Sequence, residues 1–278
     1  MTLPVLSSLR VALLGAGRVA GQLGPALLQA GHQVAYVWSR TAASAEALAA
    51  RLPGSRVVSS LDMTGLPAAD VYLLAVPDAA IPTLLAEARF PAGALVAHTS
   101  GTVPLSAFAN SPQVRGGVFY PLQTFSAGRH VDWLTVPLCI EAAEPAAEAT
   151  LLALGHTLSG TVQRVGTPQR QAMHVAAVFA CNFTNHLLGI SHALLQQQEL
   201  PLTLLAPLLH ETVEKALAHP PFTVQTGPAA RHDTPTLERH RAALAAHPQW
   251  LQIYNTLTES IQKQYLPAPE NNLPTTEL

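Results

Sequence analysis

The stretch VALLGAGRVAG, residues 11–21, decides how the rest of this chain is interpreted. It places Gly15-x-Gly17-x-x-Ala20 between a run typical of a β-strand and a helical pattern. The first glycine permits a tight turn, the second lets backbone approach a pyrophosphate, and the small third residue lets the helix pack closely on the strand. The helix N-terminus also attracts phosphates. Glycine turns can serve strand–helix packing alone, but at the head of a βαβ unit we expect dinucleotide binding.

Outward from this turn, short β-rich runs alternate with helical patterns over the first half of the chain. Such alternation indicates βαβ units and a parallel sheet. The expected strands are LRVALLGAG (9–17), QVAYVWSR (33–40), DVYLLAVPD (70–78), GALVAHTSG (93–101), VRGGVFYPL (114–122), TVPLCIEAA (135–143) and GTVQRVG (160–166).

The pattern becomes purely helical after residue 165. Thr167 is a plausible N-cap and Pro168 a plausible first residue of a helix that runs to about residue 197, longer than is usual in globular proteins. We therefore predict an α/β fold: an N-terminal Rossmann-type parallel sheet, followed by an all-helical C-terminal domain that one long helix opens. The expected domains are 1–165, nucleotide-binding, and 166–265, for substrate and dimerisation, with a flexible tail at 266–278. Further helices are expected near 203–218, 235–246 and 249–264.

Composition excludes several classes of protein. A net charge of −2 offers no basic face for nucleic acid or an anionic membrane, and no apolar run approaches the ~18 residues of a membrane span. The charged fraction of 12% is about half the usual ~25%, which hints at a buried subunit interface. The two cysteines, Cys139 and Cys181, are expected as reduced, packed thiols in a cytoplasmic protein, since the first residues lack a signal-peptide pattern. HETVEKALAH (210–219) lacks zinc-helix spacing, so no metal is expected.

Polar residues at the ends of the expected strands suggest the ligand site. An acidic residue after the second strand would favour NAD, but this chain has Ser39, Arg40 and Thr41, a set suited to the 2′-phosphate of NADP. Arg40 could instead be a solvated residue at the start of a helix. Other strand ends carry polar groups at the same edge of the sheet, although turn chemistry could also explain them: Asp78, His98, Thr99, Ser100, Gly101, Tyr120, Gln123, Thr124 and Ser126.

The long helix is apolar around most of its circumference, which predicts burial on several sides. At about 100° per residue, one polar stripe holds His174, Gln171, Asn182, Asn185 and His192, with His186 just beside it. We expect this stripe to face a wet cleft. The alternative is a ladder of hydrogen-bonded amides in the core.

Taken together, the glycine turn, the short β/α domain and the long helix resemble the 6-phosphogluconate dehydrogenase-like superfamily, which includes ketopantoate reductase, pyrroline-5-carboxylate reductase and deazaflavin-dependent NADP reductases. HTSG, YPLQTFS, NFTNHL and TGPAARHDTPTLERH resemble more closely a bacterial family of Rossmann-like proteins with its own helical C-terminal domain and no assigned reaction. The resemblance implies NADP as cofactor, a substrate between the two domains and a homodimer formed through the helical domain. It places NADP on Gly15, Gly17, Arg18, Val19, Ala20, Ser39, Arg40, Thr41, Val76 and Asp78.

For the reacting centre, the resemblance implies Ser100, Gly101 and Asn182. The further expected substrate contacts are Tyr120 and Gln123 at a strand end, Asn185 on the polar stripe, and Arg231. Hydroxyacid-type relatives carry a catalytic lysine four residues before the helix asparagine. This chain has Val178 there, so that lysine mechanism is not available. His98 and His174 are the candidate proton donors in its place, since histidine suits acid–base work near neutral pH. Either could instead be a packing histidine.

Arg231 lies in a glycine- and proline-containing loop before a helix that Asp233 or Thr234 caps. It could clamp a substrate carboxylate, or form a structural ion pair with Asp233. We therefore expect an NADP-dependent reductase of a small carbonyl or imine substrate, carboxylate-bearing by preference. The alternative is a non-catalytic NADP-binding sensor or regulatory protein. The sequence does not identify the substrate or the direction of reaction.

Overall fold

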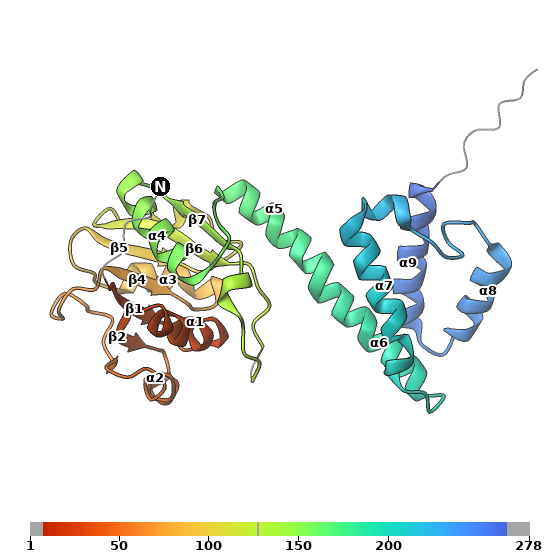
Figure 1. The fold of residues 1–278 in the computed structure, drawn as a ribbon, viewed down its shortest axis with the longest axis horizontal. Helices are drawn as coiled ribbons and strands as arrows, with labels where there is room; N and C mark the ends of the chain where they lie inside the picture. The colour runs from red at the N-terminus through yellow and green to blue at the C-terminus, as the bar shows by residue number, and fades with distance from the viewer. Residues whose placement is uncertain (1–7, 127, 266–278) are drawn as a thin grey trace, which may run out of the picture. The chain divides into compact units, whose positions relative to one another are not determined.

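The computed structural model describes residues 8–126 and 128–265. Within them, eight strands form one sheet in the order β3-β2-β1-β4-β5-β6-β7-β8 (Figure 1). Neighbouring strands run parallel except for β6 and β7, which are antiparallel. The strands are β1 Arg10–Leu14, β2 Gln33–Trp38, β3 Arg56–Val58, β4 Val71–Leu74, β5 Ala94–His98, β6 Val114–Pro121, β7 Leu138–Ala142 and β8 Val162–Arg164.

The Rossmann-type sheet is thus confirmed, with two differences from the sequence prediction. The sequence did not indicate β3, because three residues carry too little pattern. Nor did it indicate that β7 reverses direction.

Alternation along the strands builds two cores, one on each face of the sheet. Val11 and Leu13 of β1 belong to the first core, whereas Ala12 and Leu14 belong to the second. Successive side chains point to opposite faces, so a central parallel strand is apolar throughout. The first core includes residues of α1 Arg18–Gln29, α2 Ala42–Ala49 and α4 Pro145–Leu158, and the second includes residues of α3 Ile81–Glu87.

Between β6 and β7 the chain crosses the first core without a long helix. Phe125, Trp133 and Val136 are buried there, and the Phe125 and Trp133 ring centroids lie 5.7 Å apart. This segment replaces the helix that would connect two parallel strands, which is consistent with the reversed direction of β7.

The long helix comprises α5 Thr167–Ala177, a π-helical segment Val178–Phe183 and α6 Thr184–Gln196. Two expectations about it were wrong. Gly166 is the N-cap and Thr167 the first helical residue, because the Thr167 side chain is engaged with Glu141 instead. The uniform 100° spacing also fails, because a π segment bonds i to i+5 and offsets the residues that follow.

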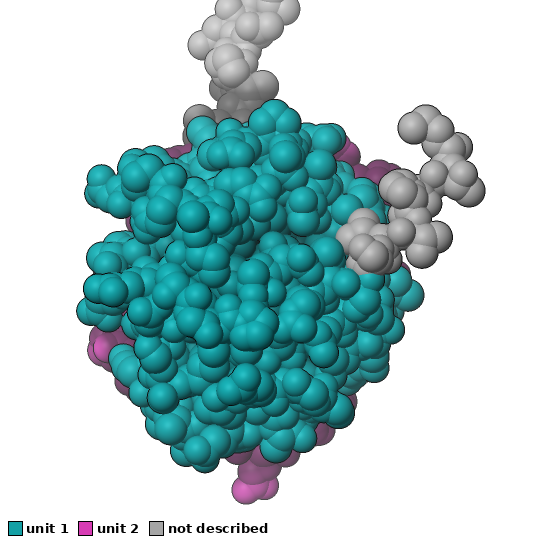
Figure 2. Space-filling model, turned by 90° about the vertical axis from the view of Figure 1, so that its left-hand side faces the viewer, with its two compact units in different colours: residues 1–182 teal, residues 183–278 magenta. Residues whose placement is uncertain are grey.

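The chain separates into two compact units, residues 1–182 and 183–278, coloured in Figure 2. Their boundary lies inside the long helix, so α5 belongs to the first unit by its contacts. The domain limits 1–165 and 166–265 stay a prediction, and the tail 266–278 lies outside the described residues. The second unit contains α6 together with α7 Ala206–Ala218, α8 Thr234–Ala243 and α9 Pro248–Gln264, close to the predicted ranges.

The second unit buries very little of its own surface. No residue from 171 to 228 is buried, and the buried apolar residues described in this unit are Ala229, Leu237 and Leu244. The expectation that the long helix is buried on several sides is therefore wrong for the single chain. Cys139 is buried as expected, but Cys181, on the long helix, is exposed. No helix in the described part of the chain has the length and apolarity to cross a membrane.

Candidate functional site

The glycine turn between β1 and α1 has the geometry of a nucleotide-binding turn. Gly15 has a φ of +124°, and a Cβ there would lie 2.2 Å from the Ala75 carbonyl oxygen, so only glycine fits. The Gly15 amide donates to the carbonyl of Trp38 at 2.7 Å, which ties the turn to the end of β2. Gly17 is the N-cap of α1, without a side-chain cap, and no atom lies within 4 Å of its Cβ position. The first amides of α1 have no intrahelical partner and no side-chain cap, so an anion can bind at this end of the helix.

Most of the other residues expected to bind the cofactor lie around this turn. Arg18 and Arg40 are exposed, and neither makes a side-chain hydrogen bond or ion pair within the described residues. Thr41 is the N-cap of α2 but its hydroxyl caps no amide, and Ser39 is half-buried beside it. Val19 is half-buried and Ala20 buried at the start of α1. Val76 reaches the turn as well, with its Cγ1 3.2 Å from the Gly15 Cβ position.

Asp78 makes a contact that the sequence did not indicate. It follows β4, and its carboxylate accepts a hydrogen bond from the hydroxyl of Thr102 in the loop after β5. Asp78 therefore connects two loops at the carboxyl edge of the sheet. Any contact with the cofactor stays a prediction.

Hydrogen bonds between nearby residues of the chain stabilise the loop after β5. The Ser100 hydroxyl oxygen accepts from the amides of Thr102 and Val103, at 3.1 and 3.0 Å. His98 is fully buried and stacks on Phe108, with ring centroids 5.9 Å apart, and its Nδ1 accepts from the Ser100 amide at 3.2 Å. Burial lowers the pKa of His98 to about 4. These contacts favour the packing interpretation of His98 and a structural use of the Ser100 hydroxyl.

Gly101 lies against a hydrogen-bonded pair of side chains from β6 and α5. The Tyr120 hydroxyl and His174 Nδ1 are 3.1 Å apart. A Cβ on Gly101 would lie 2.6 Å from that Nδ1 and 2.8 Å from Tyr120 Cζ, so the close approach needs glycine. His174 is half-buried, and burial raises the pKa of Tyr120 to about 12. Gly101, Tyr120 and His174, which are far apart in the sequence, thus meet at the carboxyl edge of the sheet, where α/β folds bind ligands.

The remaining expected residues are not part of this cluster. Gln123 is exposed, and its side-chain oxygen accepts from the Thr124 amide. Asn182, in the π segment, and Asn185, in the second unit, are exposed, so the core ladder of amides is wrong. Arg231 is exposed, and no ion pair with Asp233 occurs within the described residues. Asp233 is the N-cap of α8 and accepts from the Thr236 amide, and hydrogen bonding with first the side chain and then the amide of Thr236 lowers the pKa of its carboxyl.

The sequence interpretation missed a buried ion pair beneath the loop after β5. Arg170 of α5 is completely buried, and its Nη2 lies 3.1 Å from Glu141 Oε2 on β7. Its Nη1 donates to the carbonyls of Ser100 and Val103 at 3.0 and 2.8 Å. The glutamate also accepts from the Thr167 amide, at 2.9 Å, at the start of the helix. One feature of the sequence could have indicated this ion pair: a charged residue, Arg170, lies at the start of the long helix, one turn before His174.

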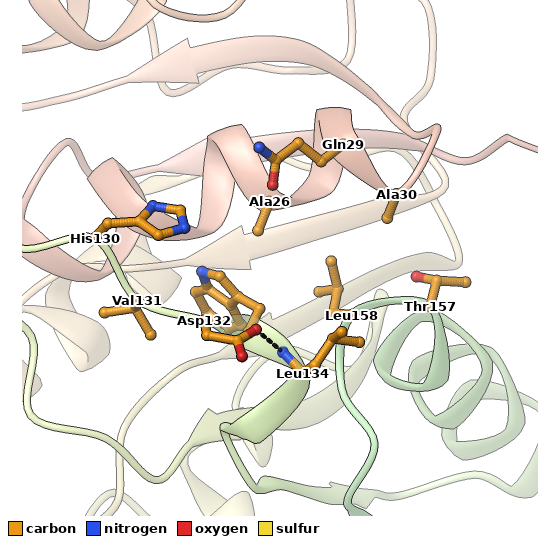
Figure 3. Close-up of a pocket in the computed structure, with 10 residues that line it drawn as sticks. Ala26, Gln29, Ala30, His130, Val131, Asp132, Leu134, Thr157 and Leu158 are labelled. Atoms are coloured by element: carbon orange, nitrogen blue, oxygen red, sulfur yellow. Dashed lines mark hydrogen bonds between the residues drawn. The ribbon is translucent and has the colours of Figure 1, made fainter.

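A separate hollow of about 310 Å³ opens at the other end of α1 (Figure 3). Ala26 and Gln29 of α1, with the C-cap residue Ala30, line it and face His130 and Asp132 of the segment between β6 and β7. Asp132 uses its carboxylate to accept from the Leu134 amide at 3.1 Å, as the dashed line in Figure 3 marks. The hollow is nearly the length of α1 from the glycine turn, so it is not the nucleotide site. No group of three or more potential metal ligands gathers in the described ranges.

Comparison with known proteins supports the two-part architecture. Residues 5–118 match a Rossmann-like domain, and residues 136–261 match a domain of unknown function (DUF2520). No curated protein has a significant sequence match. A "putative NADP oxidoreductase" from Bacteroides fragilis is 36% identical with a TM-score of 0.82, and the alignment covers 92% of this chain and 98% of that protein.

Two solved enzymes of lower identity share the fold. A reductive aminase from Aspergillus terreus, in complex with NADPH and ethyl levulinate, is 18% identical with a TM-score of 0.71, over 92% of this chain and 93% of its own. An imine reductase from Streptomyces aurantiacus is 18% identical with a TM-score of 0.64, over 91% and 95%.

Proposed function

Because the chain belongs to the family in which a Rossmann-like domain precedes the DUF2520 domain, within the 6-phosphogluconate dehydrogenase-like superfamily, we propose that it is an NADP-dependent reductase. Its substrate is a small carbonyl or imine compound. The observation that carries this proposal is that a glycine-only turn with open helix amides shares one sheet edge with the Tyr120–His174 pair.

The residues around the turn fit NADP. Gly15 brings the backbone close, Gly17 leaves room for the pyrophosphate at the start of α1, and Arg40 offers an unpaired guanidinium for the 2′-phosphate. Arg18, Ser39 and Thr41 add further donors at this end of the site. When bound, NADPH supplies the hydride for reduction.

His174 is the proposed proton donor in place of the missing lysine. Its Nδ1 is hydrogen-bonded to Tyr120, which fixes the ring, and its Nε2 has no hydrogen-bond partner in the described part of the chain. That nitrogen can pass a proton to the nitrogen or oxygen of the substrate as the C=N or C=O bond is reduced. Because His98 is buried and holds Ser100, it is the weaker candidate. Asn182 stays a proposed substrate contact.

We also propose that the protein is a cytoplasmic homodimer formed through the helical unit. Large apolar side chains are exposed on α7 and its flanks, including Leu204 at 60%, Leu208 at 62%, Leu217 at 83% and Phe222 at 68%. Exposed apolar surface on this scale marks an interface. With Arg231 and Asn185 as its substrate contacts, the helical unit would supply the carboxylate specificity.

Titration with NADPH and NADH, for the native protein and Arg40→Ala, tests the cofactor assignment. Loss of a charge-assisted contact of roughly 1.5–3 kcal/mol would weaken NADPH binding about 10- to 150-fold, with NADH nearly unchanged. Arg89→Ala is the matched control, because Arg89 is exposed just before β5, at the opposite edge of the sheet. Failure to bind either nucleotide would refute the proposal.

A turnover assay distinguishes the proposed reductase from the alternative, a non-catalytic NADP-binding sensor. Oxidation of NADPH with small keto or imino compounds would support the reductase. Tight NADPH binding without turnover over a broad panel would instead favour a non-catalytic sensor, which the valine at position 178 allows.

A further inference from the structure

Arg170 is an unusual residue to bury. Its relative exposure is 0%, yet its guanidinium makes hydrogen bonds to four groups on three different parts of the fold. Besides Glu141 and the carbonyls of Ser100 and Val103, its Nη2 donates to the Thr167 hydroxyl at 3.1 Å. The same hydroxyl accepts from the Leu105 amide at 3.1 Å. The cluster therefore joins β7, the start of α5 and the loop after β5.

Stability alone is a weak reason to retain such a pair. Removing a guanidinium from water is costly, and well-packed apolar residues often replace a buried ion pair without loss of stability. The ion pair instead fixes the relative positions of the groups around it, because a planar guanidinium sets the directions of all its hydrogen-bond acceptors at once.

The acceptors of Arg170 lie in the loop that carries Gly101. In that loop, the Ser100 hydroxyl holds the amides of Thr102 and Val103, while Arg170 holds the carbonyls of Ser100 and Val103. Both sets of backbone groups are thus fixed. Arg170 and His174 are four residues apart on α5, so they lie on the same face of the helix.

We infer that Arg170, with Glu141, is a positioning residue that sets the placement of Gly101 relative to His174 and Tyr120. This inference rests on the proposed reductase function. Arg170 does not itself touch the reacting atoms. It holds the loop on one side of the reacting centre and the helix on the other, in a single rigid unit. Because a misplacement of about 1 Å can cost ~100-fold in rate, kcat depends on it more than cofactor binding does.

The test uses Arg170→Lys, Arg170→Met and Glu141→Gln in the full-length protein. Lysine keeps the charge but lacks the planar fork, so it cannot hold both carbonyls and the carboxylate together. Arg164→Met is the matched control, because Arg164 pairs with Glu148 on the surface, and its side chain is 68% exposed. We expect kcat for NADPH-dependent reduction to fall about 100-fold in Arg170→Lys. NADPH affinity should change less than about threefold, and the control should match the native protein.

Hydrogen exchange provides a readout that does not depend on turnover. Amides of Thr102 and Val103 should exchange faster in both Arg170 variants and in Glu141→Gln, but not in Arg164→Met. If the Arg170 variants do not fold, both kcat and hydrogen exchange are measured on Glu141→Gln instead. A folded Arg170→Lys protein with native kcat and native exchange would overturn the inference. If the native protein binds NADPH without turnover, the proposed function fails, and exchange alone still decides whether Arg170 holds the loop.

Discussion

Replacing Gly101 by alanine tests the geometry of the proposed reacting centre most directly. The added Cβ would lie 2.6 Å from His174 Nδ1, 2.8 Å from Tyr120 Cζ and 3.0 Å from His174 Cγ. Overpacking of this kind costs roughly 1–3 kcal/mol, while alanine regains about 0.4–1 kcal/mol by restricting the unfolded chain. The net loss of roughly 0.5–2 kcal/mol corresponds to a Tm lower by about 1–8 °C for a protein of this size.

The contacts also predict which second substitution relieves the strain. His174→Ala removes two of the three close atoms, so Gly101→Ala should cost less in that background than in the native protein. Tyr120→Phe keeps Cζ and should give no relief. The control is Gly65→Ala, where no atom lies within 4 Å of the new Cβ. Thermal unfolding of the single and double variants measures these differences. A Gly101→Ala protein with native Tm, and no coupling to His174→Ala, would refute the placement of these three residues.

Three further predictions concern other parts of the molecule. Gly15→Ala should destabilise by more than about 2 kcal/mol and abolish NADPH binding, because φ is +124° and a backbone carbonyl blocks the new Cβ; denaturant unfolding and titration check this. Burial gives His98 a pKa of about 4, below its ordinary 6.5, so the unfolded chain binds the proton first. The His98 contribution is therefore intact above pH 6.5 and is lost as the pH falls toward 4, on the order of 3 kcal/mol, and His98→Gln should flatten the dependence of Tm on pH in this window. Leu208→Glu combined with Leu217→Glu should dissociate the proposed dimer in sedimentation experiments, whereas Leu134→Glu, at a leucine of the first unit that is 68% exposed, should not.

The Rossmann-type half of the chain could be predicted from sequence because its signals are local. The strand at 11–14 is apolar on both faces and is followed by glycines, so neither a surface strand nor a helix fits it. Weak or non-local features were missed. β3 has only three residues, and the reversal of β7 depends on how residues 122–137 cross the core, which no periodicity reports.

The sequence predicted which residues lie at the strand ends of the candidate site, but not which hydrogen bonds their side chains make. His98, Ser100 and Tyr120 were expected at one edge of the sheet, yet the sequence could not show that His98 and Ser100 bond each other while Tyr120 bonds His174. The Tyr120–His174 pairing depends on side-chain directions across 54 residues of chain, and the His98–Ser100 contact depends on how the loop after β5 turns back on itself. The role of Arg170 could not be predicted either, because its partners on β7 and in the loop after β5 lie 29 and 67–70 residues away in the sequence.

The π segment shows how one local deviation changes the assignment of a whole helix face. On a uniform wheel, Asn182 lies about 80° from His174. A π turn accommodates about one extra residue, which subtracts roughly 100° and brings the end of the segment to within about 20° of the His174 direction. By this geometry, the π segment brings Asn182 closer to the face of α5 that carries His174 and Arg170 than the roughly 80° of a regular helix would. Since π turns form at the cost of regular hydrogen bonding and occur frequently at functional sites, this alignment supports the proposal that Asn182 contacts the substrate on the side of the helix that carries the proposed proton donor, His174.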